Sequence, residues 1–217
     1  MLKFSPALLL FAATLFAQPP APALTYQQSW PAADPSFFEI TIQPTGTAHY
    51  RSVAHQQANS TQPPDPFDLD FTLSPQSTQR VFSLAPNLAR FQPTLDKIKV
   101  AFTGAKTLRY QPAAGAPLVL SYNYSASPEL TDLTELLRAI SESIELSETL
   151  RTQLRFDKFS LDATLKRAEE LAALRRFPEL QLLQPILTRI ANDPAVMNIA
   201  RQRARRLLQI QPSAKPK

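Results

Sequence analysis

The sequence predicts an α+β protein, in which an antiparallel sheet of about six strands carries helices on one face and precedes a helical C-terminal region. Two observations predict this class. Up to about residue 140, short segments alternate apolar and polar residues and are separated by proline and glycine. From residue 141 onward, Leu, Ala, Arg and Glu dominate, and apolar residues recur at helical spacing. An order of three strands and one helix occurs twice before residue 141, which fits either a duplication or two similar units.

The first βββα unit ends in a helix whose start is well marked. Ser74 supplies a capping hydroxyl, and Pro75 fits the first helical position because its missing N–H needs no partner there. The helix is predicted to run to about Ala89 and to bend at Pro86. The three strands predicted before it comprise residues 38–42, 48–50 and 67–73.

The second βββα unit repeats this order. Ser127 and Pro128 begin its helix, whose apolar stripe fails beyond Ser147, so we expect the helix to break or bend there. Its predicted strands comprise residues 98–102, 108–110 and 118–124. Strand alternation predicts burial of Phe38, Ile40, Phe71, Val100 and Leu120, and exposure of Glu39, Asp70 and Lys99.

Three further helices are expected in the helical region. Ser160 is predicted to cap the first. Pro178 is predicted to begin the second, which should kink at Pro185 because an interior proline clashes with the preceding turn. Asp193 and Pro194 are predicted to start the last helix, with the carboxylate accepting backbone N–H groups.

The last predicted helix places one arginine within its inward stripe. Arg203 lies there, where an unpaired guanidinium would be costly. We expect it to pair with a carboxylate or helix-end carbonyls of a neighbouring element, and favour a carboxylate from the preceding helical region. Alternatively, its stem packs and its head reaches water past Ala200. The apolar residues that define this stripe are Val196, Ile199, Ala200, Leu207 and Ile210.

The N-terminus has the pattern of a secretory signal peptide. Lys3 precedes an apolar run from Ala7 to Phe16, and Ala17 stands before a polar, proline-rich segment. The run is shorter than the roughly 20 residues that span a bilayer. We therefore expect cleavage near Ala17, a secreted or periplasmic protein, and no membrane span.

Five parts are expected along the chain. They are a signal peptide at 1–17, a proline-rich N-terminal linker at 18–35, the α+β domain at 36–140, the helical region at 141–211 and a disordered tail at 212–217. Residues 18–140 hold 8 basic and 9 acidic side chains, whereas residues 141–217 hold 14 and 9. The basic excess after residue 17 therefore belongs to the helical region.

Composition excludes several classes of function. The chain has no cysteine, which rules out disulfides, thiol nucleophiles and cysteine metal sites. Its three scattered glycines form no phosphate-binding loop, and neither Gly-x-Ser-x-Gly nor His-Glu-x-x-His occurs. We expect no cofactor and no bound metal.

A few polar residues are candidates for chemistry. His49 and His55 could form part of a metal or base site, but they lie on a predicted strand end and loop without a third ligand at metal spacing. Asp65, Asp68 and Asp70 could bind calcium or hydrolyse a glycoside. The favoured interpretation is structural, with both strand aspartates on a solvated face. Their expected cross-strand partners are Lys97 and Lys99.

Arginines near the C-terminus are the best candidate binding surface. Arg201 and Arg205 are predicted to face away from the apolar stripe, with Arg206 to one side. They could bind phosphate, an acidic envelope polymer or an acidic protein, or they could be an ordinary solvated helix end. Nucleic acid is not expected, because no aromatic residues interleave the arginines.

The stretch from Leu183 to Leu208 resembles a HEAT-type helical repeat, with Pro185 on a bent first helix and Asp193 at the turn. The HEAT pattern has an arginine where this chain has Met197. The resemblance implies a helical hairpin for protein contacts, without catalytic residues. The whole chain resembles exported bacterial α+β proteins of unknown function, which implies no activity.

The sequence therefore favours a non-enzymatic binding or structural module that contacts a protein partner through its helical region. The alternative is an envelope hydrolase or other enzyme that uses the carboxylates near Asp68. These hypotheses differ in where functional groups should gather, on the helical surface or on the sheet.

Overall fold

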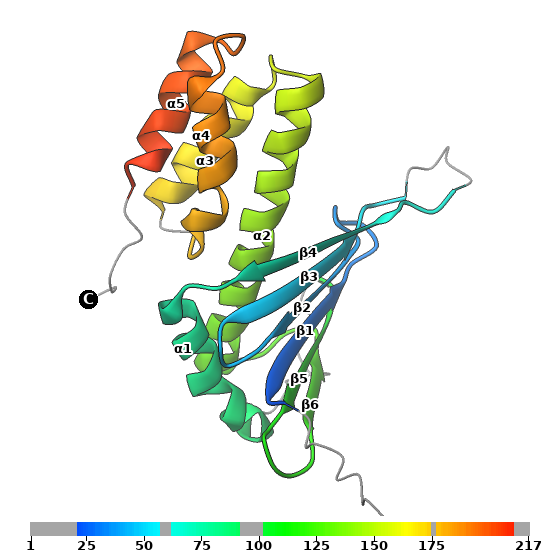
Figure 1. Cartoon of the computed structure of the whole chain (residues 1–217). Coiled ribbons are helices and arrows are strands. Elements are labelled where there is room, and N and C mark those ends of the chain that lie inside the picture. The colour runs from blue at the N-terminus through cyan, green and yellow to red at the C-terminus, as the bar shows by residue number, and fades with distance from the viewer. Residues whose placement is uncertain (1–20, 57–61, 92–101, 175–176, 211–217) are drawn as a thin grey trace, which may run out of the picture.

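A computed structural model describes residues 21–56, 62–91, 102–174 and 177–210, and it confirms the α+β class. Six antiparallel strands form one sheet, helices cover one of its faces, and a helical region continues beyond it (Figure 1). The strands lie in the order β4-β3-β2-β1-β5-β6. Their bounds are Ala23–Ser29 (β1), Phe37–Ile42 (β2), Thr47–Val53 (β3), Pro66–Thr72 (β4), Ala105–Gln111 (β5) and Leu118–Tyr122 (β6).

The strand β1 differs from the expectation of a linker at 18–35. It pairs with β2 on one side and β5 on the other, so it lies in the middle of the sheet. Leu24 and Tyr26 are buried on its core face, and Thr25 points to the opposite face. The first unit therefore contains four strands. The strand predicted at 98–102 lies outside the described residues except for Phe102, which is exposed and in no strand.

Burial in the sheet follows the predicted alternation at most positions. Phe38, Ile40 and Leu120 are buried and Asp70 is exposed, as expected. Phe71 is only partly buried because β4 is an edge strand with no neighbour on one side. Glu39, expected to be exposed, is half-buried and accepts a hydrogen bond from the Gln27 side chain on β1. Val100 and Lys99 lie outside the described residues.

Two helical segments begin as the sequence predicts. The helix α1 (Pro75–Leu84) starts after Ser74, whose hydroxyl accepts a bond from the Ser77 N–H. The helix α2 (Pro128–Phe156) starts after Ser127, which accepts from the Leu130 N–H. The predicted bend at Pro86 takes the form of a 3-10 helix, η1 (Ala85–Arg90), that follows α1 directly.

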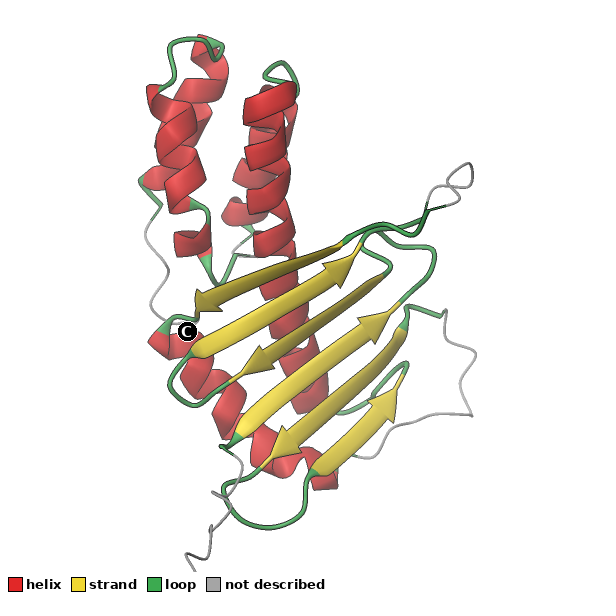
Figure 2. Ribbon diagram, turned by 45° about the vertical axis from the view of Figure 1, so that its right-hand side comes forward, coloured by secondary structure: helices red, strands yellow, loops and turns green. Residues whose placement is uncertain are grey.

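The helix α2 connects the two halves of the molecule. It runs unbroken through Ser147, so of the break or bend expected there, a break is excluded. Ser147 is buried and donates to the Leu182 carbonyl, and the buried stripe continues through Leu150 and Leu154. Figures 1 and 2 show the first part of α2 behind the sheet and its last turns within the helical region.

Helix starts in the helical region differ from the predictions. The Ser160 side chain makes no cap bond and donates to Asp157 instead. Pro185 lies in the first turn of α4, where it causes no kink. Asp193 accepts from the Ala195 N–H in a turn, and the last helix starts later, after Met197. The elements are α3 (Leu161–Ala173), η2 (Leu180–Leu182), α4 (Gln184–Asn192) and α5 (Asn198–Leu208).

Separate apolar cores fill the sheet half and the helical region. Between them, polar side chains join the sheet to α2. The Tyr50 hydroxyl on β3 lies 2.9 Å from the Ser141 hydroxyl and donates to Glu145 at 2.7 Å. Burial, aided by the charge of Glu145, raises the pKa of Tyr50 far above its ordinary value, so this phenol stays protonated.

Candidate interaction surface

Two of the three arginines predicted as a binding surface bond other residues of the helical region. Arg206 Nε donates to Glu169 at 2.7 Å, and an Arg205 guanidinium nitrogen donates to the Ala191 carbonyl at 3.0 Å. Arg201 is half-buried, and its Nε is buried without a hydrogen-bond partner among the described residues. The bonds of Arg205 and Arg206, and the partial burial of Arg201, weaken the case for a free basic surface.

Arg203 pairs as expected. Its Nε donates to Asp162 at 2.7 Å, and another guanidinium nitrogen donates to Glu169 at 2.5 Å. Both carboxylates lie on α3, in the preceding helical region. The predicted apolar stripe is confirmed at Val196, Ala200 and Leu207, but it is wrong at Ile199 and Ile210, which are exposed.

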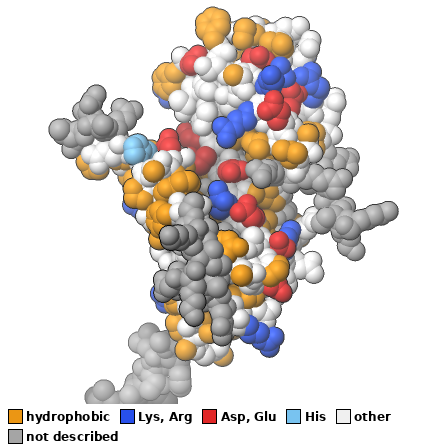
Figure 3. Space-filling model, turned by 180° about the vertical axis from the view of Figure 1, so that it is seen from behind, with side chains coloured by type: hydrophobic (Ala, Val, Ile, Leu, Met, Phe, Trp, Pro, Cys, Tyr) orange, Lys and Arg blue, Asp and Glu red, His pale blue; other side chains and the backbone are white. Residues whose placement is uncertain are grey.

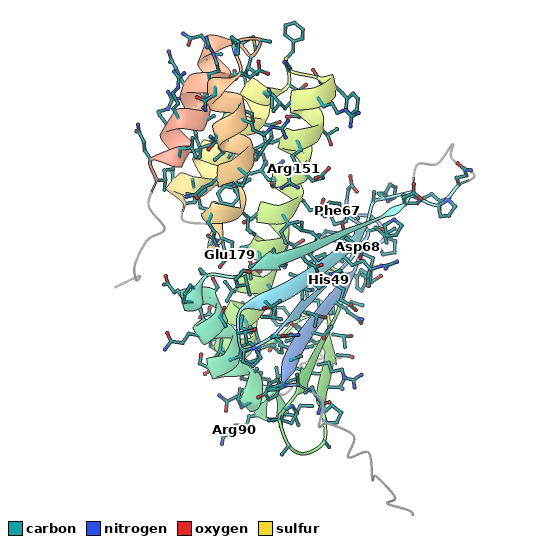
Figure 4. All side chains as sticks on the ribbon, viewed as in Figure 1. His49, Phe67, Asp68, Arg90, Arg151 and Glu179 are labelled. Carbon is teal, nitrogen blue, oxygen red and sulfur yellow. The ribbon has the colours of Figure 1, made fainter. Side chains whose placement is uncertain are left out.

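The strand aspartates pair with β3. His49 Nδ1 lies 2.8 Å from Asp70 and its Nε2 lies 3.2 Å from Asp68 (Figure 4). Arg51 lies 3.7 Å from Asp68. A hydrogen bond to Asp70, followed by one to Asp68, raises the pKa of His49. The expected partners Lys97 and Lys99 lie outside the described residues.

This arrangement suits a charge ladder better than a catalytic pair. Both imidazole nitrogens of His49 contact carboxylates, so neither is available to take a proton from a substrate. Asp68 and Asp70 are exposed on the uncovered sheet face that Figure 2 presents. His55 Nδ1 bonds the Pro31 carbonyl, which fixes a loop, and Asp65 is an exposed loop residue.

A buried lysine was not anticipated from the sequence. Lys106 on β5 lies 2.9 to 3.3 Å from four oxygens, which belong to Thr103, Gly104 and Asn123. Burial, together with the charge of Arg138, lowers its pKa to about 8. These bonds join the start of β5 to the end of β6. Because an ammonium has three protons and four oxygens surround this one, no proton is left for a substrate.

Two hollows lie beside α1. The larger, about 550 Å³, lies between α1 and α2, and its walls carry two internal ion pairs, Arg80 with Asp132 and Arg138 with Glu135. The smaller, about 430 Å³, adjoins the β2–β3 turn and includes Phe82. Neither hollow includes His49 or the aspartates beside it.

Apolar side chains gather at the far end of the helical region, as the top of Figure 3 shows. Phe156, the last residue of α2, is 74% exposed, and Phe159, in the turn before α3, is 81% exposed. Met197 and Ile199 are 39% and 49% exposed at the start of α5. We call these four residues the apolar tip.

Local bonds hold the apolar tip in shape. Lys158 donates to Asp193 at 2.8 Å and thereby joins the α2–α3 turn to the α4–α5 turn. Asp157 accepts from both the hydroxyl and the N–H of Ser160, and these bonds lower the pKa of its carboxyl. The Arg155 guanidinium lies 4.8 Å from the centre of the Phe156 ring. These contacts fix the turn beside which the two phenylalanines project.

Among the described residues, no group of three or more His, Cys, Asp or Glu is arranged to hold a metal ion. No helix in the described ranges is long and apolar enough to cross a membrane.

Comparisons with known proteins give no family for this chain. No protein-family model matches it, and a search of curated proteins finds no significant match. A proposal for the function must therefore rest on the sequence and structure of this chain.

Proposed function

We propose that this protein is an exported, non-enzymatic binding module that docks on a protein partner through its helical region. The observation that carries this proposal is the apolar tip, where Phe156 and Phe159 are largely exposed beside a turn that the Lys158–Asp193 ion pair holds in place. Large aromatic side chains in water gain free energy when a partner buries them, and aromatic residues often dominate binding energy at protein interfaces.

The chemistry of the tip indicates the kind of partner surface. A convex turn with two neighbouring phenylalanines fits an apolar pocket. Arg155 is exposed and stacks on Phe156, so its guanidinium can also meet a carboxylate at the rim of such a pocket. The HEAT-like resemblance of the α4–α5 hairpin supports the same use of the helical region.

Photo-crosslinking tests this proposal. We expect p-benzoylphenylalanine in place of Phe159 to give one discrete protein adduct in the native envelope fraction, and the Phe156→Ser change to remove it. The matched control carries the photoprobe at Val119, an exposed apolar residue on the sheet, and should give no such adduct. Crosslinks to lipid alone, or the same adduct from both positions, would contradict a tip-specific protein partner.

Export is part of the proposal and rests on the residues up to Ala17, which lie outside the described ranges. Cleavage after Ala17 leaves Gln18 as the first residue. The intact mass of the extracytoplasmic protein should therefore lack the first seventeen residues, and a chain that retained Met1 would contradict cleavage.

A further inference from the structure

The strand β4 leaves one edge of the sheet unpaired in the described structure. It pairs with β3 on one side and has no strand on the other (Figures 1 and 2). Successive residues of an antiparallel strand direct their backbone groups to opposite sides. The pairing on the β3 side therefore determines which β4 groups point outward.

A hydrogen bond at the turn between β3 and β4 fixes this assignment. Gly46 accepts from the Leu73 N–H at 2.9 Å, so Leu73 faces β3. Given the register of β3 and β4, the backbone N–H and C=O groups of Phe67, Leu69 and Phe71 also point toward β3. The alternate residues direct their backbone groups away from the sheet, and these are Pro66, Asp68, Asp70 and Thr72.

Three outward residues can form a new ladder. Asp68, Asp70 and Thr72 each offer one N–H and one C=O, and all three residues are exposed. No backbone bond joins them to a described segment beyond β3. Pro66 has no N–H, so a pairing strand would begin at Asp68.

The two flanks of this edge differ in chemistry. On the core side, Phe67, Leu69 and Phe71 are partly buried and lack a neighbour toward the edge. On the open side lie Asp68 and Asp70, which contact His49 on β3, with Arg51 also near Asp68. The Asp70 side chain is still 89% exposed, and Figure 4 shows where Phe67 and Asp68 lie on this strand. The side chains of an added strand would therefore lie beside apolar residues of β4 on the core face and beside aspartates of β4 on the open face.

The same carboxylates oppose pairing of β4 with a second β4. Two such strands would bring aspartates of both copies together on one face, and like charges across a ladder are destabilising. A strand with cationic residues at those positions would instead gain from the contact.

We infer that the β4 edge binds an extended segment of a partner protein, with alternating cationic and apolar side chains, as a seventh strand. This surface lies on the sheet and is separate from the apolar tip. Backbone hydrogen bonds to Asp68, Asp70 and Thr72 would supply the docking, and the aspartate side chains would select the cations.

The test uses a blocked synthetic peptide of seven residues, alternating lysine and valine, and the full chain after signal cleavage. We expect the peptide to bind and to slow amide hydrogen exchange at Asp68, Asp70 and Thr72. A peptide with glutamate in place of lysine should bind more weakly. A lysine–valine peptide with N-methyl groups on the ladder-forming amides should not bind, because it keeps the charge but loses the backbone bonds.

The Asp70→Asn variant checks the selecting charge. Asp70 is exposed, so this change should leave the fold intact, and it should weaken peptide binding roughly twofold to fivefold, as expected for a surface ion pair. Thr107→Ser on β5, remote from the edge, is the matched control and should leave binding unchanged. Equal binding of the N-methylated peptide, or protection on β6 instead of β4, would overturn the inference.

Discussion

Replacing Glu179 with alanine is expected to lower the free energy of unfolding by about 1–3 kcal/mol, because it leaves partly buried donors without a partner. Glu179 is fully buried where the helical region meets the start of α1 (Figure 4). Its carboxylate accepts from the Ser74 N–H at 2.8 Å and from the Ser74 hydroxyl at 2.9 Å, and also from the Gln181 side chain.

The loss should be large because Ser74 has a second role. The same hydroxyl accepts from the Ser77 N–H and so caps α1. Glu179 therefore fixes the orientation of the capping group while it joins two parts of the chain 105 residues apart. Removal of the carboxylate affects both the helix start and the junction.

Chemical denaturation of matched variants measures this effect. Glu170→Ala is the control, since Glu170 is an exposed residue on α3. Glu179→Gln should fall between the control and Glu179→Ala, because its amide oxygen can still accept one bond from Ser74. If Glu179→Ala and Glu170→Ala unfold at the same denaturant concentration, the Ser74 contact contributes nothing to stability.

Local sequence signals predicted much of this fold because they act over a few residues. Ser74 and Ser127 cap their helices as expected, and the two-residue alternation gives the buried face of β2. The same alternation is present in β1, but its glutamines and the surrounding prolines concealed a central strand. Its burial depends on pairing with β5, about 80 residues away, which local pattern does not encode.

Helix limits were harder to predict for the same reason. Ser147 interrupts the apolar stripe of α2 in sequence, yet its hydroxyl bonds the Leu182 carbonyl, so the helix continues. Asp193 has the chemistry of a cap, but it binds the Ala195 N–H and Lys158, and α5 begins only after Met197. In both cases the side chain bonds a residue that the local sequence pattern does not indicate.

Helical spacing predicted that one arginine needs a partner, but it did not predict the partners of the other two. Arg203 could be placed from helical period alone, because an arginine among apolar residues must find an acceptor. The partners of Arg205 and Arg206 could not, since exposed positions carry no such requirement. The apolar tip was missed because Phe156 and Phe159 resemble core residues in sequence, and only the turn between α2 and α3 exposes them.

Replacing Arg203 with alanine is expected to lower the melting temperature by a few degrees, because one guanidinium serves two carboxylates. Asp162 and Glu169 both accept from it, and Arg206 would remain as a partner of Glu169 alone. Asp162 would then lose the ion pair that joins it to α5. Thermal unfolding followed by circular dichroism measures the change.

The matched control is Arg167→Ala, which removes an exposed arginine from α3 and should shift the melting temperature little. Equal shifts for the two variants would show that Arg203 acts as an ordinary surface charge.

Acid provides a second test of the Arg203 contact. Burial alone would raise the pKa of the Glu169 carboxyl, but the bonds from Arg206 and Arg203 outweigh it and hold this pKa below its ordinary value of 4.5. A carboxyl whose pKa is lower in the folded chain contributes stability above its unfolded pKa and loses it as pH falls through the folded value. The difference in melting temperature between the natural chain and Arg203→Ala should therefore be full near pH 7 and shrink as the pH falls below about 4.5. A difference that stayed constant down to pH 2 would show that Arg203 stabilises the helices through packing of its stem and not through these carboxylates.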